Sequence, residues 1–297
     1  MRVLLCRKKA YRFVILNDEN HKKSYEIGKI KRPQNEVLIM PNILWSVFFS
    51  VWAIKKPLLY SSHDNLLKDL QEVKSLCKLA EKKKVILSVG FSKRFTPPYV
   101  NCKKIIKNGL IGKISQITAK MCQGWFKSNF LENQVCYIID IMSFLLGSDY
   151  KCVISRAKNF YSKPNYPIDG LVALLEFQNG VLGTLCVNST SPSLKPWERI
   201  EVFGDQKWVK IDDSRKLVLY DSNEGPTKTW EPVWPNTLLM DTHFSGFVGE
   251  ITAFLDAVQV ISDPITSGWD GFKALELAYA LHMSYKMKKE VELPLDI

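Results

Sequence analysis

The stretch Leu171–Asn188 reads LVALLEFQNGVLGTLCVN and predicts a β-hairpin. Leu171–Phe177 alternates between two faces, as a half-buried strand does. Asn179-Gly180 is a strong hairpin turn, because both residues tolerate the positive φ that a tight turn requires. Val181–Asn188 then continues as the partner strand. Strands joined by so short a turn run antiparallel.

Further strands and helices are predicted on both sides of this hairpin. The strands are Ile114–Met121, Arg199–Phe203, Trp208–Ile211 and Leu217–Tyr220, and amphipathic helices follow at Val248–Val260 and Gly271–Lys286. Consecutive strands separated by short turns favour an antiparallel sheet. We therefore expect such a sheet across residues 114–220, with Asn179-Gly180 at a hairpin tip.

The first part of the chain shows a different pattern. Tyr11–Leu16 (YRFVIL), Val37–Met40 and Val85–Val89 (VILSV) are β-rich runs. Between the last two, leucines and other apolar residues recur at helical spacing after His63-Asp64, and Lys82–Lys84 suits the last turn of a helix. Strand, helix and strand in this order indicate a parallel α/β layer.

The segment Val37–Ile54 carries no charge, and its length is near the lower limit for a membrane-spanning helix. Pro41-Asn42 interrupts it, and proline disfavours helix just before it. The segment is therefore predicted to be a buried strand followed by a short buried helix, with no membrane partner. The start of the chain lacks the long apolar core of a signal peptide. The seven cysteines have no metal or redox spacing, which favours reduced thiols in the cytoplasm.

Positive charge is concentrated in the first part of the chain. Residues 1–120 hold 25 Lys and Arg against 8 Asp and Glu, whereas residues 121–297 hold 16 against 22. Such a balance suits a polyanionic ligand such as a dinucleotide, and the alternative is a solvated lysine-rich surface. No nucleic-acid motif accompanies the charge, so no nucleic-acid partner is expected. The four histidines lack metal-ligand spacing, so no metal site is predicted.

An ordered set of short motifs resembles the glucose-fructose oxidoreductase / inositol dehydrogenase (Gfo/Idh/MocA) family. It begins with Lys55-Lys56-Pro57, a helix, Val89-Gly90-Phe91 and Arg94-Phe95. It continues through Lys107–Ile114, Phe177–Gly180, Ile200–Gly204, Phe247–Phe254, Asp270-Gly271 and Ala274–Ser284. The resemblance covers roughly residues 35–294, and the spacing of the whole set is more specific than any single piece.

The resemblance implies a fold of class α/β plus α+β. A shortened Rossmann-like parallel layer would occupy residues 1–95, and an antiparallel-sheet domain with flanking helices would occupy residues 96–297. It also implies NAD or NADP as cofactor, hydride transfer on a sugar or polyol, and a homo-oligomer formed through the sheet domain.

Two departures from the family pattern stand out. The glycine-rich turn that normally follows the first strand is missing, since Gly28 is the single glycine before Pro41. Such glycines let the backbone approach a pyrophosphate. In the catalytic stretch, Tyr137 falls where the family has a histidine, Asn133 replaces the first aspartate, and Asp140 retains the second.

The resemblance assigns catalytic roles to Lys56, Tyr137 and Asp140. It assigns cofactor contacts to Pro41, Asn42, Lys56 and Arg94. A lysine can polarise the reacting oxygen, and a nearby lysine can lower the pKa of a tyrosine that acts as acid or base. Each assignment has an alternative: a surface lysine at Lys56, a packed aromatic at Tyr137, and a domain contact at Arg94.

The sequence is compatible with three functions. The first is an active NAD(P)-dependent oxidoreductase on a sugar-like substrate. The second is a catalytically impaired relative that serves as a binding or oligomerisation module. The third is a diverged chain whose incomplete Rossmann layer leaves an unpaired strand edge and exposed apolar surface.

Overall fold

The structure is a computed structural model. It describes residues 3–7, 10–16, 22–27, 38–39, 66–83, 86–122, 135–160, 168–189, 196–222, 224–231, 245–260 and 263–297. The chain divides into two compact units, residues 1–91 with 250–275 and residues 92–249 with 276–297.

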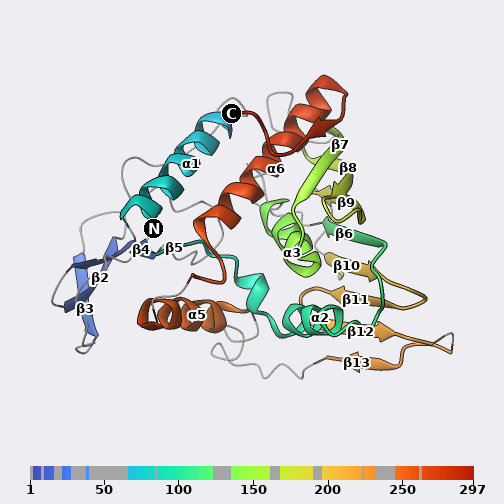
Figure 1. Ribbon diagram of the computed structural model, residues 1–297, viewed down its shortest axis with the longest axis horizontal. Helices are drawn as coiled ribbons and strands as arrows, with labels where there is room; N and C mark the ends of the chain where they lie inside the picture. The colour runs from blue at the N-terminus through green and yellow to red at the C-terminus, as the bar shows by residue number, and fades with distance from the viewer. Residues whose placement is uncertain are drawn as a thin grey trace. The chain divides into compact units, whose positions relative to one another are not determined.

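The first unit contains a five-stranded sheet and helix α1 (Figure 1). Its elements are β1 (Val3–Arg7), β2 (Ala10–Leu16), β3 (Lys22–Ile27), β4 (Leu38–Ile39), α1 (Leu66–Lys83) and β5 (Leu87–Ser88), and the strand order is β3-β2-β1-β4-β5. Strands β4 and β5 are parallel and α1 lies between them in sequence, which confirms the predicted parallel α/β layer. The remaining strand pairs of this sheet are antiparallel, so the parallel part is limited to one pair.

Helix α1 packs through one apolar stripe. Leu70, Val73 and Cys77 are buried at the spacing of a helix face. A Cβ atom added to Gly268 would lie 2.4 Å from Leu87 Cδ2 and 3.1 Å from Cys77 Sγ, so only glycine allows this close approach. The close packing ties α1 and β5 to the start of the last helix within this unit.

The second unit is built on a nine-stranded sheet. Its strands are β6 (Gln116–Cys122), β7 (Tyr150–Lys158), β8 (Gly170–Phe177), β9 (Leu182–Asn188), β10 (Glu198–Phe203), β11 (Trp208–Asp212), β12 (Lys216–Tyr220), β13 (Lys228–Trp230) and β14 (Val291–Glu292). Their order is β13-β12-β11-β10-β6-β9-β8-β7-β14. The helices of the remaining chain are η3 (Ser92–Phe95), α2 (Pro97–Lys107), α3 (Cys136–Leu146), α5 (Phe247–Val260) and α6 (Gly268–Met287). The predicted sheet and both predicted C-terminal helices are confirmed.

One strand pair of this sheet differs from the expectation. Strands β6 and β9 are parallel, in register from Gln116 with Leu182 to Cys122 with Asn188. The β8–β9 hairpin itself is antiparallel as predicted, and Gly180 takes a φ of 81° at its tip. The hairpin turns the chain back on itself, so its second strand runs in the direction of β6.

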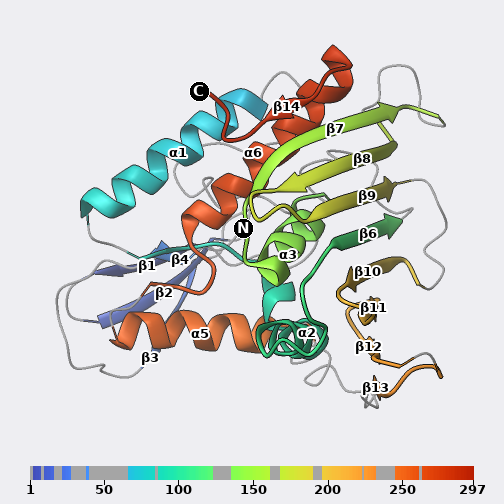
Figure 2. The ribbon, with the colours of Figure 1, turned by 45° about the vertical axis from the view of Figure 1, so that its right-hand side comes forward.

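The two faces of this sheet are different. Figure 2 shows α2 and α3 on one face, where alternate strand residues such as Ile117, Leu185 and Ile200 are buried. The opposite face, called the open face below, carries the alternate residues, including Val172 and Leu174, which are 57% and 58% exposed.

None of the described helices is long and apolar enough to cross a membrane. The predicted strand at Val37–Met40 corresponds to β4, and the helix predicted to follow it lies outside the described residues.

Candidate active site

The structure describes three of the six predicted site residues. Arg94 lies on η3, while Tyr137 and Asp140 lie on α3. Pro41, Asn42 and Lys56 lie outside the described residues. All three described residues of the candidate site lie in the second unit.

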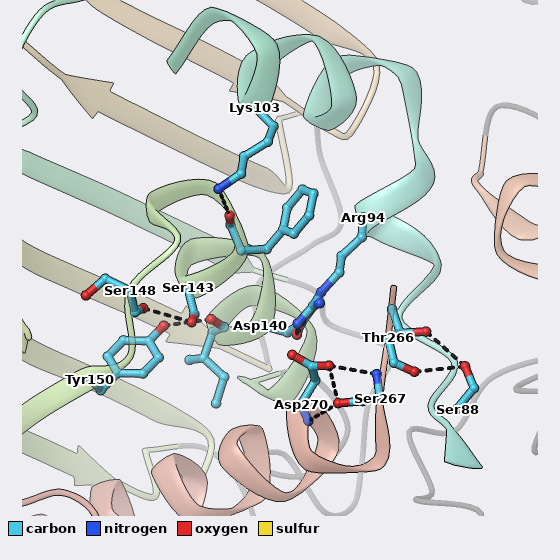
Figure 3. Close-up of polar contacts among 12 residues, drawn as sticks. Ser88, Arg94, Lys103, Asp140, Ser143, Ser148, Tyr150, Thr266, Ser267 and Asp270 are labelled. Atoms are coloured by element: carbon cyan, nitrogen blue, oxygen red, sulfur yellow. Dashed lines mark hydrogen bonds and ion pairs between the residues drawn. The ribbon is translucent and has the colours of Figure 1, made fainter. Parts of the chain in front are cut away.

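Arg94 and Asp140 form a buried ion pair (Figure 3). Arg94 Nε donates to Asp140 Oδ2 at 3.0 Å and to Oδ1 at 3.2 Å, and Arg94 Nη2 donates to Oδ1 at 2.6 Å. The two side chains are only 8% and 3% exposed. A guanidinium fork matches a carboxylate in this two-pronged way, and the match fixes orientation as well as charge. The contact therefore locks α3 onto η3.

Phe144 and Lys103 extend this contact. The Arg94 Cζ atom lies 5.2 Å from the Phe144 ring centroid, and Lys103 Nζ lies 5.3 Å from the same centroid. Lys103 Nζ also donates to the carbonyl oxygens of Phe144 at 2.5 Å and Leu145 at 3.0 Å. A cation at the last carbonyls of a helix complements the helix dipole. Burial, and then the nearby Arg94 charge, lower the pKa of Lys103.

The end of α3 is fixed by backbone contacts. Gly147 takes the left-handed conformation at the C-cap, with a φ of 63°, and its N–H donates to Ser143 O at 2.8 Å. Tyr150 OH donates to Ile139 O at 2.6 Å. Burial, followed by the charges of Asp140 and Asp149, holds the pKa of Tyr150 well above its usual range. Tyr150 is therefore a neutral structural donor.

Tyr137 occupies the first turn of α3 and is half-buried. It precedes Asp140 by three residues, and residues three apart are neighbours on a helix surface. The neighbouring Ile138 and Ile141 are fully buried. Tyr137 thus differs from the core residues around it, because part of its side chain is accessible.

A second buried polar cluster was missed by the sequence interpretation. Glu198, the first residue of β10, is fully buried. It accepts hydrogen bonds from Tyr99 OH at 2.5 Å and Ser214 Oγ at 2.7 Å, and it forms an ion pair with Lys93. Burial, and then Glu198, hold the pKa of Tyr99 well above its usual range. The predicted strand began at Arg199. Glu198 lies two residues before Ile200, so both side chains point to the buried side of the strand, and this alternation could have identified Glu198 as a buried acid.

The two clusters are joined by adjacent residues of η3. Lys93 pairs with Glu198 on the sheet, and Arg94 pairs with Asp140 on α3. Consecutive cations thus attach this short helix to the sheet on one side and to α3 on the other. The arrangement positions α3 and its first turn; neither carboxylate is left as an exposed acid or base.

The described residues also bear on cofactor and metal binding. Strand β1 pairs with β2 directly, with Arg7 opposite Ala10, so the described part of the first strand pair offers no strand-to-helix turn for a pyrophosphate. The predicted contacts at Pro41, Asn42 and Lys56 lie between β4 and α1, outside the described residues. Across the described residues, no three His, Cys, Asp or Glu side chains gather as metal ligands.

Residues 99–210 match the GFO/IDH/MocA C-terminal domain. This match covers most of α2 and strands β6 to β10, together with the helix that carries Tyr137 and Asp140. This part of the chain is therefore similar to the Gfo/Idh/MocA family. The resemblance inferred from the sequence motifs is thus confirmed for this domain.

Similarity to full-length relatives extends beyond the matched domain. The chain is 24% identical over 236 residues to myo-inositol 2-dehydrogenase of Thermotoga maritima, covering 76% of this chain and 70% of that protein. It is 26% identical over 253 residues to the scyllo-inositol 2-dehydrogenase (NAD(+)) of Bacillus subtilis, covering 81% and 70%.

Solved structures support the fold. Levoglucosan dehydrogenase in complex with NADH and L-sorbose superposes with a TM-score of 0.66 at 19% identity, covering 76% of this chain and 70% of that one. An oxidoreductase from Agrobacterium radiobacter in complex with NAD+, L-tartaric acid and magnesium gives a TM-score of 0.65 at 19% identity, covering 75% and 69%. The predicted fold class, with a Rossmann-like layer and a largely antiparallel sheet, is confirmed.

Proposed function

We propose that this protein is an NAD-dependent oxidoreductase that acts on a polyol or sugar, with a cyclic polyol of the inositol type as the first substrate to test. The similarity to two inositol dehydrogenases over three quarters or more of the chain supports this reaction class. The bound nicotinamide would supply the hydride chemistry.

The observation that carries the proposal is the Arg94–Asp140 ion pair. It holds α3, the helix that the resemblance identifies as catalytic, in a fixed position. This contact leads us to propose different roles for Asp140 and Arg94. Asp140 was predicted to be catalytic and Arg94 to contact the cofactor, whereas we assign both as positioning residues because their charged atoms face each other.

Tyr137 then remains as the proposed acid or base of the described part of the site. It is half-buried on the first turn of the anchored helix, where part of its side chain stays accessible. Lys56 is proposed as the donor that polarises the reacting oxygen, on the strength of its position before Pro57. Pro41 and Asn42 remain proposed cofactor contacts.

The function is tested on the purified full chain. NADH and NADPH are titrated by fluorescence, and reduction of NAD+ and NADP+ is then followed with myo-inositol, scyllo-inositol and open-chain polyols. Tyr137→Phe is the matched variant, because it removes one hydroxyl and preserves the ring. We expect turnover in the native chain and a large loss of kcat in Tyr137→Phe; equal kcat values would refute the role of Tyr137.

We expect dinucleotide affinity to be weak. The glycine-rich turn is absent from the first segment of the sequence, and β1 pairs with β2, with Arg7 opposite Ala10. Loss of two charge-assisted hydrogen bonds to a pyrophosphate costs about 3 kcal/mol, which is about a hundredfold in affinity. A submicromolar dissociation constant for NADH, at order-of-magnitude precision, would contradict this expectation.

A binding or oligomerisation module is the second candidate function. The open face of the sheet favours it, because Val172, Leu174 and Leu182 are each more than half exposed there. We propose that a homo-oligomer forms through this domain in the cytoplasm, where the thiols stay reduced. Light scattering measures the assembly, and a complete absence of turnover with every polyol would favour this second function.

A further inference from the structure

Trp197 lies directly before β10 and contacts the Lys93–Glu198 pair. Its side chain is half-buried, and Lys93 Nζ lies 5.2 Å from its ring centroid. Glu198 points to the same side of the strand as the buried Ile200, so the Trp197 ring beside Lys93 lies at the end of β10, away from the open face. Lys93 is 14% exposed, whereas the Glu198 side chain is fully buried. The accessible part of this cluster therefore includes Lys93 and Trp197.

The turn between β11 and β12 holds the cluster in place with a strained backbone. Asp213 and Ser214 have φ angles of 54° and 55°, which residues other than glycine adopt uncommonly. Asp213 Oδ1 accepts the backbone N–H of Trp197 at 2.8 Å and of Glu198 at 3.2 Å. Ser214 Oγ donates to Glu198 Oε1 at 2.7 Å and accepts from Lys93 Nζ at 3.2 Å. Such strained residues persist where surrounding contacts fix them, and they cluster at functional sites.

Lys93 and Trp197 each keep a hydrogen-bond donor that no described residue uses. An ammonium group has three N–H donors, and Lys93 Nζ directs two of them to Glu198 Oε2 and Ser214 Oγ. The indole N–H of Trp197 has no acceptor among the residues that the structure describes. Two such donors in one fixed, partly accessible cluster suit the hydroxyl oxygens of a ligand.

The charges of the cluster favour a neutral ligand. Glu198 offsets the charge of Lys93, and Asp140 offsets that of the neighbouring Arg94. A charge is costly to bury unless it is paired. A phosphate or carboxylate group would therefore bring an uncompensated negative charge to the Lys93–Glu198 pair, whereas a hydroxyl oxygen needs only a donor. This balance matches an uncharged polyhydroxylated compound.

Helix η3 connects this cluster to the proposed active site. Lys93 and Arg94 are consecutive, and the contact of Arg94 with Asp140 fixes α3, whose first turn carries Tyr137. All of these residues lie in the second unit. A ligand held at Lys93 would thus be bound by the same short helix that positions the proposed acid or base.

We propose that Lys93 and Trp197 form a donor pair that binds hydroxyl oxygens of a neutral polyol, and that Glu198 makes this pair select neutral over acidic ligands. The third N–H of the Lys93 ammonium donates to one hydroxyl oxygen, and the indole N–H of Trp197 donates to another. Ser214 is a positioning residue, because it holds Lys93 and Glu198 together. This inference rests on the proposed polyol dehydrogenase function, to which it adds the charge class of the substrate.

The first test measures binding to the full chain separately from turnover. Myo-inositol, scyllo-inositol and glucose are titrated by calorimetry, and tryptophan fluorescence is recorded. Trp197→Phe removes the indole N–H and should weaken binding about three- to tenfold. The fluorescence change on binding should also decrease. The matched control is Trp208→Phe, in the Phe203–Trp208–Tyr220 stack, which should behave as the native chain does.

Three results of this first test would overturn the proposal. They are no binding of any of the three polyols to the native chain, equal dissociation constants in the native chain and Trp197→Phe, and an equal weakening in Trp208→Phe.

The second test changes the charge of the cluster and compares glucose with glucuronate. The native chain should prefer glucose. Glu198→Gln leaves Lys93 without its counter-charge, so the affinity for glucuronate relative to glucose should rise about tenfold. Ser214→Ala keeps both charges and should weaken both ligands alike. A native preference for glucuronate, or an unchanged ratio in Glu198→Gln, would show that Glu198 does not set the selectivity.

Binding and turnover distinguish this inference from the function on which it rests. Polyol binding that depends on Trp197, without reduction of NAD+ or NADP+, would support the donor pair and overturn the oxidoreductase function. Turnover of a polyol whose dissociation constant is the same in Trp197→Phe and Glu198→Gln would support the oxidoreductase and overturn the donor pair.

Discussion

Replacing Asp140 with alanine leaves the Arg94 guanidinium buried without its carboxylate. Three contacts of 2.6 to 3.2 Å are lost, and both side chains are less than one tenth exposed. Removing one partner of a buried ion pair costs about 3 to 5 kcal/mol, because the remaining charge cannot return to water. We expect a loss of this size in the unfolding free energy of the second unit for Asp140→Ala.

The assay is urea unfolding followed by circular dichroism and tryptophan fluorescence. Asp140→Asn keeps one acceptor and should lose less than Asp140→Ala. The matched control is Glu231→Ala, which breaks the exposed Lys216–Glu231 pair, whose side chains are 41% and 55% exposed. Exposed pairs contribute less than about 1 kcal/mol. A loss below about 1 kcal/mol in Asp140→Ala as well would refute the anchoring role of the Arg94 contact.

Three further substitutions test other parts of the chain. Lys56→Ala should lower kcat on the best polyol about a hundredfold, whereas Lys55→Ala should leave it nearly unchanged; equal values would remove Lys56 from the site. Glu198→Gln should lower the urea-unfolding free energy by about 2 kcal/mol, because charged hydrogen bonds are replaced by neutral ones. Gly204→Ala should also cost about 2 kcal/mol, since its Cβ would lie 1.8 Å from Ile111 O. A native-like midpoint would contradict either expectation.

The elements with strong local signals were predictable from the sequence. The Asn179-Gly180 turn confines the chain to a hairpin, and the apolar spacing that begins at Leu66 predicts α1 within a few residues. The strand β3 was missed, because its sequence KKSYEI is mostly polar and its pairing with β2 depends on a partner rather than on its own residues. Partner choice also explains why the parallel β6–β9 pair was not expected.

Single residues of the candidate site could be proposed from the sequence, but their contacts could not. Arg94 and Asp140 were each selected by the resemblance, yet they are 46 residues apart, and no local pattern reports that they meet. Their contact changes their proposed roles from cofactor binding and catalysis to positioning. The Glu198 cluster brings together residues from four separate segments. The sequence therefore indicated it only through the alternation that places one acidic residue on the buried side of its strand.

The parallel β6–β9 pair also has a consequence for how the second unit folds. Strand β6 is the seam between two meanders, β7 to β9 on one side and β10 to β13 on the other. Each meander can form from neighbours along the chain, whereas the seam joins Gln116 to Leu182 across a long intervening segment that contains α3, β7 and β8. Contacts of such high sequence separation form late, because the loop must first be closed. We therefore expect the centre of the finished sheet to be the last part of it to assemble, and amide exchange during refolding should protect β8 before β6.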